Sequence, residues 1–132
     1  MRLGFIGTGK ITSSVVTGIC NSNIKFNKIT LSSRNKKISN SLQKKFKKII
    51  ITKNNQDIVD KSDWIFLAVT PQVGEKIIKN LKFKSNQKII SFISTLTIPM
   101  LKKMIKVKVD IVRAIPLPPI SLKKGPVPIC PP

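Results

Sequence analysis

The sequence predicts an α/β protein built on a doubly wound parallel sheet. Short apolar segments of strand length alternate along the chain with longer segments whose apolar residues recur every three or four positions. The first apolar segment runs directly into a glycine-rich turn, and the segment DWIFLAV at residues 63–69 is apolar enough for a strand buried on both faces. This alternation is typical of strands joined by crossover helices.

Six strands are expected, at residues 3–6, 28–32, 49–51, 63–69, 88–92 and 110–114. Helices are expected between them, at residues 11–19, 38–46, 55–61, 71–81 and 98–105. The first helix shows the pattern clearly, because Ile11, Val15 and Ile19 lie four positions apart. Parallel strands joined by right-handed crossovers of this length predict a Rossmann-type domain over residues 1–115.

The chain changes character at Pro116, because most of its nine prolines follow in the segment PLPPISLKKGPVPICPP. Proline at this density cannot continue a helix or a central strand. Residues 116–132 are therefore expected to form a loop or linker that leaves the sheet.

The chain is strongly basic, with 25 lysines and arginines against 5 acidic residues and a formal net charge of +20. A non-catalytic NADP-binding or polyanion-binding module is therefore one alternative. However, the lysines are scattered, the chain is equally rich in Ile and Asn, whose codons are also A/T-rich, and it contains no Tyr for base stacking. We expect no specific nucleic-acid partner, only nonspecific binding at low salt.

The remaining composition indicates a cytoplasmic protein. Cys20 and Cys130 show neither metal-ligand spacing nor a disulfide pattern, so we expect a reducing compartment and no metal site. No apolar run approaches the roughly 20 residues of a membrane helix, so no membrane partner is expected. The first apolar stretch ends at once in Gly-Thr-Gly-Lys, which is unlike a signal peptide.

The turn after the first strand is the strongest indication of function. In GFIGTGKIT, Gly7 allows a tight turn, and Gly9 lets the backbone approach a pyrophosphate at the start of the next helix. Thr12 stands where the G-x-G-x-x-G pattern has its third glycine, a position that requires a small residue. The loop from Ile6 to Ile11 is therefore predicted to bind a dinucleotide, and a purely structural turn is the alternative.

The end of the second strand predicts which dinucleotide is bound. NAD sites usually place Asp or Glu there to hold the ribose 2′-hydroxyl, but this chain reads TLSSRNKK. Ser32, Ser33, Arg34 and Asn35 instead offer hydroxyls, a guanidinium and an amide, which suit a 2′-phosphate. NADP is therefore favoured over NAD, and a solvated basic turn is the alternative.

Taken together, these segments resemble pyrroline-5-carboxylate reductase. GFIGTGKIT, the SSRN turn, Asn55, SDWIFLAVTPQ and VRAIPLPP occur in that family's order and spacing, over essentially the whole chain. The resemblance implies an oxidoreductase that transfers hydride from NADPH to a small cyclic imine, pyrroline-5-carboxylate, in proline biosynthesis. A related reductase with another substrate, such as a β-hydroxyacid dehydrogenase or a coenzyme F420-dependent NADP reductase, is an alternative.

The resemblance also implies where the cofactor binds. It assigns the pyrophosphate to the loop and the 2′-phosphate to the SSRN turn. It places the adenosine near Asn55 and the nicotinamide ribose against the backbone of Ala68, Val69 and Pro71. The cofactor-binding residues are thus Ile6, Gly7, Thr8, Gly9, Lys10, Ile11, Ser32, Ser33, Arg34, Asn55, Ala68, Val69 and Pro71. The chain has no His and no paired carboxylates, so we name no catalytic residue.

The departures from the family pattern lie on the substrate side. Thr70 replaces a lysine, Leu117 and Pro118 replace an Asn-Thr pair, and residues 94–97 replace a segment of small residues. In the family, a helical C-terminal domain follows, which dimerises and holds the substrate. We expect residues 116–132 to lead to such a domain, absent from this chain, and a homo-oligomer only where that domain is present.

Overall fold

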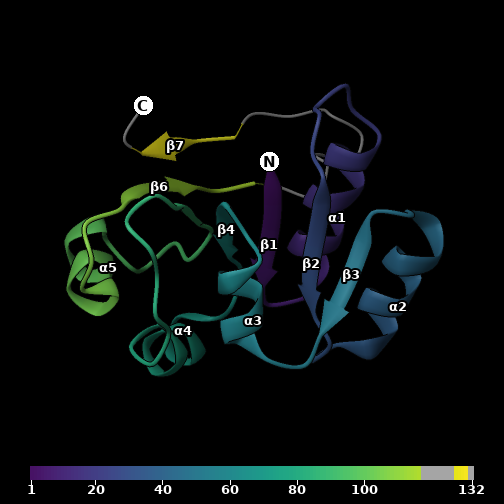
Figure 1. Ribbon diagram of the computed structural model, residues 1–132. Helices are drawn as coiled ribbons and strands as arrows, with labels where there is room; N and C mark the ends of the chain where they lie inside the picture. The colour runs from purple at the N-terminus through teal and green to yellow at the C-terminus, as the bar shows by residue number, and fades with distance from the viewer. Residues whose placement is uncertain (117–126, 131–132) are drawn as a thin grey trace.

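The computed structural model describes residues 1–116 and 127–130, and its centre is a seven-stranded sheet in the order β3-β2-β1-β4-β5-β6-β7 (Figure 1). All neighbouring strands are parallel except the last pair, β6 and β7. The strands are β1 Arg2–Ile6, β2 Lys28–Ser32, β3 Ile49–Thr52, β4 Trp64–Leu67, β5 Lys88–Ser91, β6 Asp110–Ala114 and β7 Ile129–Cys130. The predicted Rossmann-type α/β class is confirmed.

Helices cover both faces of this sheet. They are α1 Lys10–Cys20, α2 Lys36–Lys45, α3 Asn55–Asp60, α4 Pro71–Ile78 and α5 Ile98–Ile105. One core cluster contains buried residues of α1 and α2, and the other contains buried residues of α3, α4 and α5. The sheet is therefore the middle layer of three, as right-handed crossovers on either side of β1 require (Figure 1).

The core is divided between the two faces because successive strand residues point in opposite directions. On the α1 and α2 face, the rings of Phe5 and Phe66 stack with their centroids 4.3 Å apart. Ile65 and Leu67, on the other face, are fully buried. Burial of each such side chain stabilises the fold by about 1.5–3 kcal/mol. The prediction of a strand buried on both faces is thus confirmed for Ile65, Phe66 and Leu67 of β4.

Several predicted boundaries were wrong by one to three residues. The fourth helix ends at Ile78 rather than at residue 81, because the N–H groups of Asn80 and Leu81 bond to carbonyls three residues back and tighten the last turn. The fourth strand has four residues rather than seven, so Ala68 and Val69 lie in the connection that follows it.

The prediction of six parallel strands missed β7. Ile129 and Cys130 pair antiparallel with Ala114 and Arg113 of β6, and the N–H of Ile115 donates to the carbonyl of Pro128 at 3.0 Å. Proline is tolerated here because an edge strand needs only one side of its backbone to pair. The expected loop over residues 116–132 thus contains a short strand, while its residues 117–126 and 131–132, including Leu117 and Pro118, lie outside the described residues.

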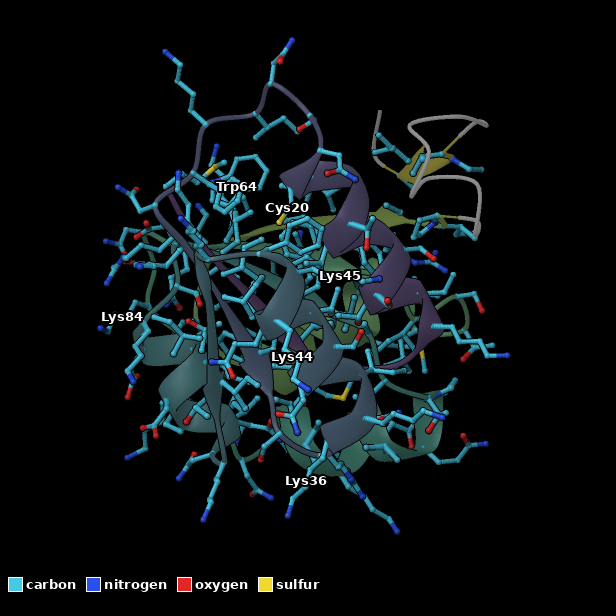
Figure 2. All side chains as sticks on the ribbon, turned by 90° about the vertical axis from the view of Figure 1, so that its right-hand side faces the viewer. Cys20, Lys36, Lys44, Lys45, Trp64 and Lys84 are labelled. Atoms are coloured by element: carbon cyan, nitrogen blue, oxygen red, sulfur yellow. The ribbon has the colours of Figure 1, made fainter. Side chains whose placement is uncertain are left out.

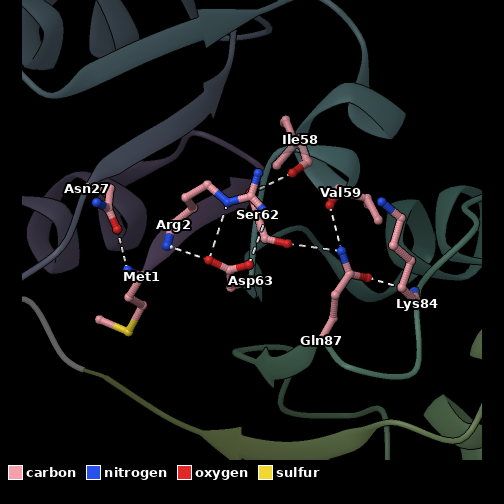
Figure 3. Close-up of polar contacts among 9 residues, drawn as sticks. All are labelled: Met1, Arg2, Asn27, Ile58, Val59, Ser62, Asp63, Lys84 and Gln87. Carbon is pink, nitrogen blue, oxygen red and sulfur yellow. Dashed lines mark hydrogen bonds and ion pairs between the residues drawn. The ribbon is translucent and has the colours of Figure 1, made fainter.

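A polar network closes the amino end of the sheet, opposite the loops that follow the strands (Figure 3). The buried amide of Gln87 donates to the carbonyls of Val59 and Ser62, at 2.7 and 3.0 Å. Arg2 binds Asp63 through its backbone N–H and through two guanidinium nitrogens, one of which lies 3.0 Å from Oδ1. These bonds join the start of β1 to the residue before β4, and the residue before β5 to the end of α3.

The stability of this end is expected to depend on pH through Asp63. Hydrogen bonds from the side chain and the backbone N–H of Arg2 lower the pKa of the Asp63 carboxyl below its usual value. Because the folded-state pKa is lowered, Asp63 stabilises the fold above its unfolded pKa and loses that contribution as pH falls through the folded one.

We expect Asp63→Asn to flatten the acid side of the stability profile, measured by urea unfolding between about pH 2 and 6. The effect is small because the pair is exposed to solvent. Asp110→Asn, which removes the same charge without touching Arg2, is the control. An acid-side slope for Asp63→Asn equal to that of the unchanged protein would contradict this role.

Candidate functional site

The candidate site lies where the carboxyl ends of β1 and β4 meet. The strand order reverses at this pair, because β2 and β3 extend to one side of β1 while β4, β5 and β6 extend to the other. Crossover helices diverge at such a point and leave a crevice outside the strand ends, the usual place for a dinucleotide in open α/β sheets. Two predicted segments meet here, the loop after β1 and the Ala68–Val69 connection after β4.

Gly7 makes this meeting possible. Its φ is +98°, in the region that residues with side chains rarely adopt, and a Cβ at this position would lie 2.3 Å from the backbone oxygen of Ala68. The chain is held there by a 2.8 Å hydrogen bond from the Ala68 N–H to the carbonyl of Ile6. The predicted residues Ile6, Gly7, Ala68 and Val69 are thus brought together.

Gly9, unlike Gly7, borders open space. It is the N-cap of α1, and an added Cβ would meet no heavy atom within 4 Å beyond its chain neighbours. No side chain caps the helix, and its first turn contains no acidic residue. The free N–H groups and the positive dipole end of α1 therefore point at a space that an anion can occupy, with Lys10 exposed beside it.

The side chain of Thr12 stabilises the loop through a hydrogen bond to its backbone. Its side chain is fully buried, and its Oγ1 donates a 2.7 Å hydrogen bond to the carbonyl of Gly7. The sequence indicated only that a small residue fits in place of the third glycine. The structure adds a bond that glycine cannot make, and the hydroxyl five residues after Gly7 is the signal from which it could have been anticipated.

A second hydroxyl connects the loop to the end of β2. Thr8 is buried, and its Oγ1 donates to the carbonyl of Ser32 at 2.8 Å. The Oγ of Ser32 in turn accepts from the N–H of Arg34 at 3.2 Å, which forms a turn beside the loop. The guanidinium of Arg34 is exposed at this turn. The sequence pattern placed Thr8 in the loop but gave no indication of this contact.

The other predicted residues have more ordinary surroundings. The Asn35 side chain caps α2, accepting from the N–H of Ile38 at 3.3 Å, so its amide oxygen is already engaged. Asn55, half-buried, is the first residue of α3, whose cap is Asn54. Pro71 occupies the first position of α4, as predicted. Asn55 and Pro71 thus follow the carboxyl ends of β3 and β4, on the same edge of the sheet as the loop.

The loop from Ile6 to Ile11 and the Ala68–Val69 connection contain no Asp, Glu or His. Burial raises the pKa of the Cys20 thiol, which keeps it protonated at the far end of α1. Among residues 1–116 and 127–130, no group of three or more His, Cys, Asp or Glu side chains could hold a metal ion, and no helix is long and apolar enough to cross a membrane. Among the described residues of the loop and this connection, the ionisable side chain is that of Lys10.

The basic residues do not form part of one site. Lysines lie on α1, α2, α4 and α5 and in the connecting loops. Lys36, Lys44 and Lys45 project from the outer side of α2, while Lys84 projects from a different part of the molecule (Figure 2). A solvated basic surface of this kind attracts polyanions nonspecifically at low salt.

The strand order, the positive-φ glycine and the uncapped helix start define the class of a dinucleotide-binding Rossmann domain. The chain belongs to the family described as NADP oxidoreductase coenzyme F420-dependent, which it matches over residues 2–97. It is also 27% identical, over 128 residues, to pyrroline-5-carboxylate reductase 3 from Danio rerio. The resemblance to pyrroline-5-carboxylate reductase that the motifs indicated is thereby confirmed.

Two solved reductase structures are similar in fold to this chain. The pyrroline carboxylate reductase of Plasmodium falciparum, solved with NADP bound, has a TM-score of 0.84 and 27% identity, over 98% of this chain and 47% of that one. The pyrroline-5-carboxylate reductase of Coxiella burnetii has a TM-score of 0.84 and 24% identity, over 96% and 48%. The match to the Danio rerio protein covers 95% of this chain and 44% of that protein, so the chain spans about half the length of these relatives.

Proposed function

We propose that this chain is the NADP-binding domain of a reductase that transfers hydride from NADPH to a small cyclic imine such as pyrroline-5-carboxylate. The observation that carries the proposal is the loop of Gly7 and Gly9, which is packed against Ala68 and open beside Gly9 at the start of α1. The relatives named above, one of them with NADP bound, support both the cofactor and the substrate class.

In this proposal each part of the crevice binds one part of the cofactor. The loop from Ile6 to Ile11 and the helix start hold the pyrophosphate, because free N–H groups and the helix dipole favour an anion. Ser32, Ser33 and Arg34 hold the adenosine 2′-phosphate. Asn55 lies near the adenosine, and the backbone of Ala68, Val69 and Pro71 lines the nicotinamide ribose. Bound NADPH supplies the hydride, and the protein orients it.

The domain organisation is part of the proposal. Residues 1–115 form the cofactor-binding unit. Residues 116–132, although Ile129 and Cys130 pair with β6 of its sheet, lead toward a second, substrate-holding unit like that of the longer relatives. The match to about half of each relative's length is consistent with this division. We propose further that an assembly of both units reduces the imine. A homo-oligomer would form through the second unit.

Cofactor titration tests the proposal directly. Dissociation constants for NADPH and NADH are measured on the 132-residue chain by calorimetry or by nicotinamide fluorescence. We expect binding of both, with NADPH preferred, and no binding of either at millimolar concentration would refute the proposal. Residues 94–97 and Thr70 depart from the family pattern, so a substrate screen should include imines other than pyrroline-5-carboxylate.

Arg34 provides a residue-level test. Arg34→Ala is expected to weaken NADPH binding by about 1–3 kcal/mol, since a charged hydrogen bond to the 2′-phosphate is lost, and to leave NADH binding nearly unchanged. Lys45→Ala, which removes one positive charge from the other end of the following helix, is the control and is expected to leave the preference intact. Equal weakening of both cofactors by Arg34→Ala would contradict the assigned role.

A further inference from the structure

We propose that the Thr8 side chain is the residue that positions Arg34 for NADPH over NADH, by fastening the Ser32–Arg34 turn to the phosphate loop. The inference rests on the function proposed above and adds to it a selectivity role for a side chain that does not itself reach the 2′-phosphate. Thr8 is thus a positioning residue, whose buried hydroxyl joins the two halves of the adenosine side.

The inference rests on two hydrogen bonds that hold the peptide unit between Ser32 and Ser33 in place. The carbonyl of Ser32 accepts from the Thr8 hydroxyl at 2.8 Å, and the N–H of Ser33, in the same peptide plane, donates to the carbonyl of Thr52 at 3.0 Å. The plane is thus held between the loop after β1 and the end of β3. A peptide plane bonded at both edges cannot rotate without breaking a hydrogen bond.

Thr8 adds a bond beyond the paired part of the sheet. The register of β1 and β2 ends at Phe5 and Leu31, one residue before Ser32, and the positive φ of Gly7 follows the end of β1 at Ile6. The hydroxyl of Thr8 extends the connection by one more bond from the loop. Because Thr8 is only 5% exposed, an apolar residue of the same shape could fill its space but could not donate.

Arg34 lies directly downstream of the clamped peptide. Its N–H donates to the Oγ of Ser32 at 3.2 Å, so the direction in which its side chain leaves the turn follows from the orientation of Ser32. The loop that would hold the pyrophosphate and the turn that would hold the 2′-phosphate are therefore kept in register by one hydroxyl. A ligand with both phosphates depends on that register, whereas NADH, which has no 2′-phosphate, does not.

The test compares Thr8→Val with Thr8→Ser, measuring dissociation constants for NADPH, NADH and adenosine 2′,5′-bisphosphate on the 132-residue chain. We expect Thr8→Val to raise the constants for NADPH and the bisphosphate about fivefold to tenfold and that for NADH less than about twofold. Thr8→Ser, which retains the hydroxyl, is expected to restore the preference. Thr17→Val is the control. It removes a part-buried hydrogen bond within α1, in which the Thr17 hydroxyl donates to the carbonyl of Ser13 at 2.7 Å, away from the turn.

Each outcome decides the inference. Unchanged cofactor preference in Thr8→Val, equal weakening of both cofactors, or the same loss of preference in Thr17→Val would each overturn it. Thermal unfolding of the variants distinguishes a general loss of stability from a change in cofactor preference. A general loss of stability would not change the ratio of the dissociation constants for NADPH and NADH. If the unmutated chain binds neither cofactor, the proposed function fails and this inference with it, whereas a preference that persists in Thr8→Val overturns the inference alone.

Discussion

Replacing Gly9 by alanine is expected to weaken NADPH binding while leaving the fold intact. The added Cβ meets no protein atom within 4 Å, so it would project into the space beside the start of α1 that the pyrophosphate is proposed to occupy. Inserting a methyl group into a filled space costs about 1–3 kcal/mol, which corresponds to a rise of roughly 5-fold to 150-fold in the dissociation constant. Calorimetric titration with NADPH and NADH measures it.

The fold should tolerate this change. Gly9 has extended backbone angles that alanine adopts freely, and alanine in place of glycine at an N-cap costs at most about 1 kcal/mol. A urea midpoint close to that of the unchanged protein is therefore expected. A Gly9→Ala chain that folds and binds NADPH as tightly as before would show that the pyrophosphate does not approach this backbone.

Replacing Gly7 by alanine is expected to destabilise the whole domain. The Cβ would lie 2.3 Å from the backbone oxygen of Ala68 and 2.8 Å from Cγ1 of Val69, so two strands or their connections would have to separate. The positive φ adds about 1–2 kcal/mol of backbone strain, and the overpacking adds about 1–3 kcal/mol. We expect the free energy of unfolding to fall by about 2–5 kcal/mol, measured by urea denaturation.

Gly9→Ala is the matched control for this second variant, because the chemical change is identical and only two residues away. The pair separates two roles of the loop: Gly7 allows the strands to meet, and Gly9 leaves room for the ligand. A Gly7→Ala chain as stable as the unchanged protein would mean that the loop can rearrange away from Ala68.

Much of the site could be anticipated because its requirements are local. A strand, a turn that needs glycine and a helix start follow one another within a few residues, so the sequence pattern Gly7-x-Gly9 is sufficient to predict them. The lack of an acid at the end of β2 is equally local. The positions of Ser33 and Arg34 after that strand followed without knowledge of the tertiary structure.

The missed features depend on contacts between distant segments. The bond from Thr8 to Ser32 spans 24 residues, and no periodicity within either segment indicates it. β7 was missed because the prolines that flank it argue against a central strand, whereas pairing at the edge beside β6 tolerates them. The ends of β4 and α4 were misplaced because hydrogen bonds made by the flanking residues, rather than hydrophobicity, decide where an element stops.

The sequence by itself determined the fold class, the order of the first six strands and the five helices, and the chemistry offered at the strand ends of the candidate site. Alternating apolar periodicity and glycine placement are properties of neighbouring residues. Only the tertiary structure decided how Gly7 fits against Ala68 and how Thr8 and Thr12 hold the loop, because these contacts form when separate segments pack together. The empty space beside Gly9 also appears only in the folded chain, since it is defined by atoms from the segments that surround it.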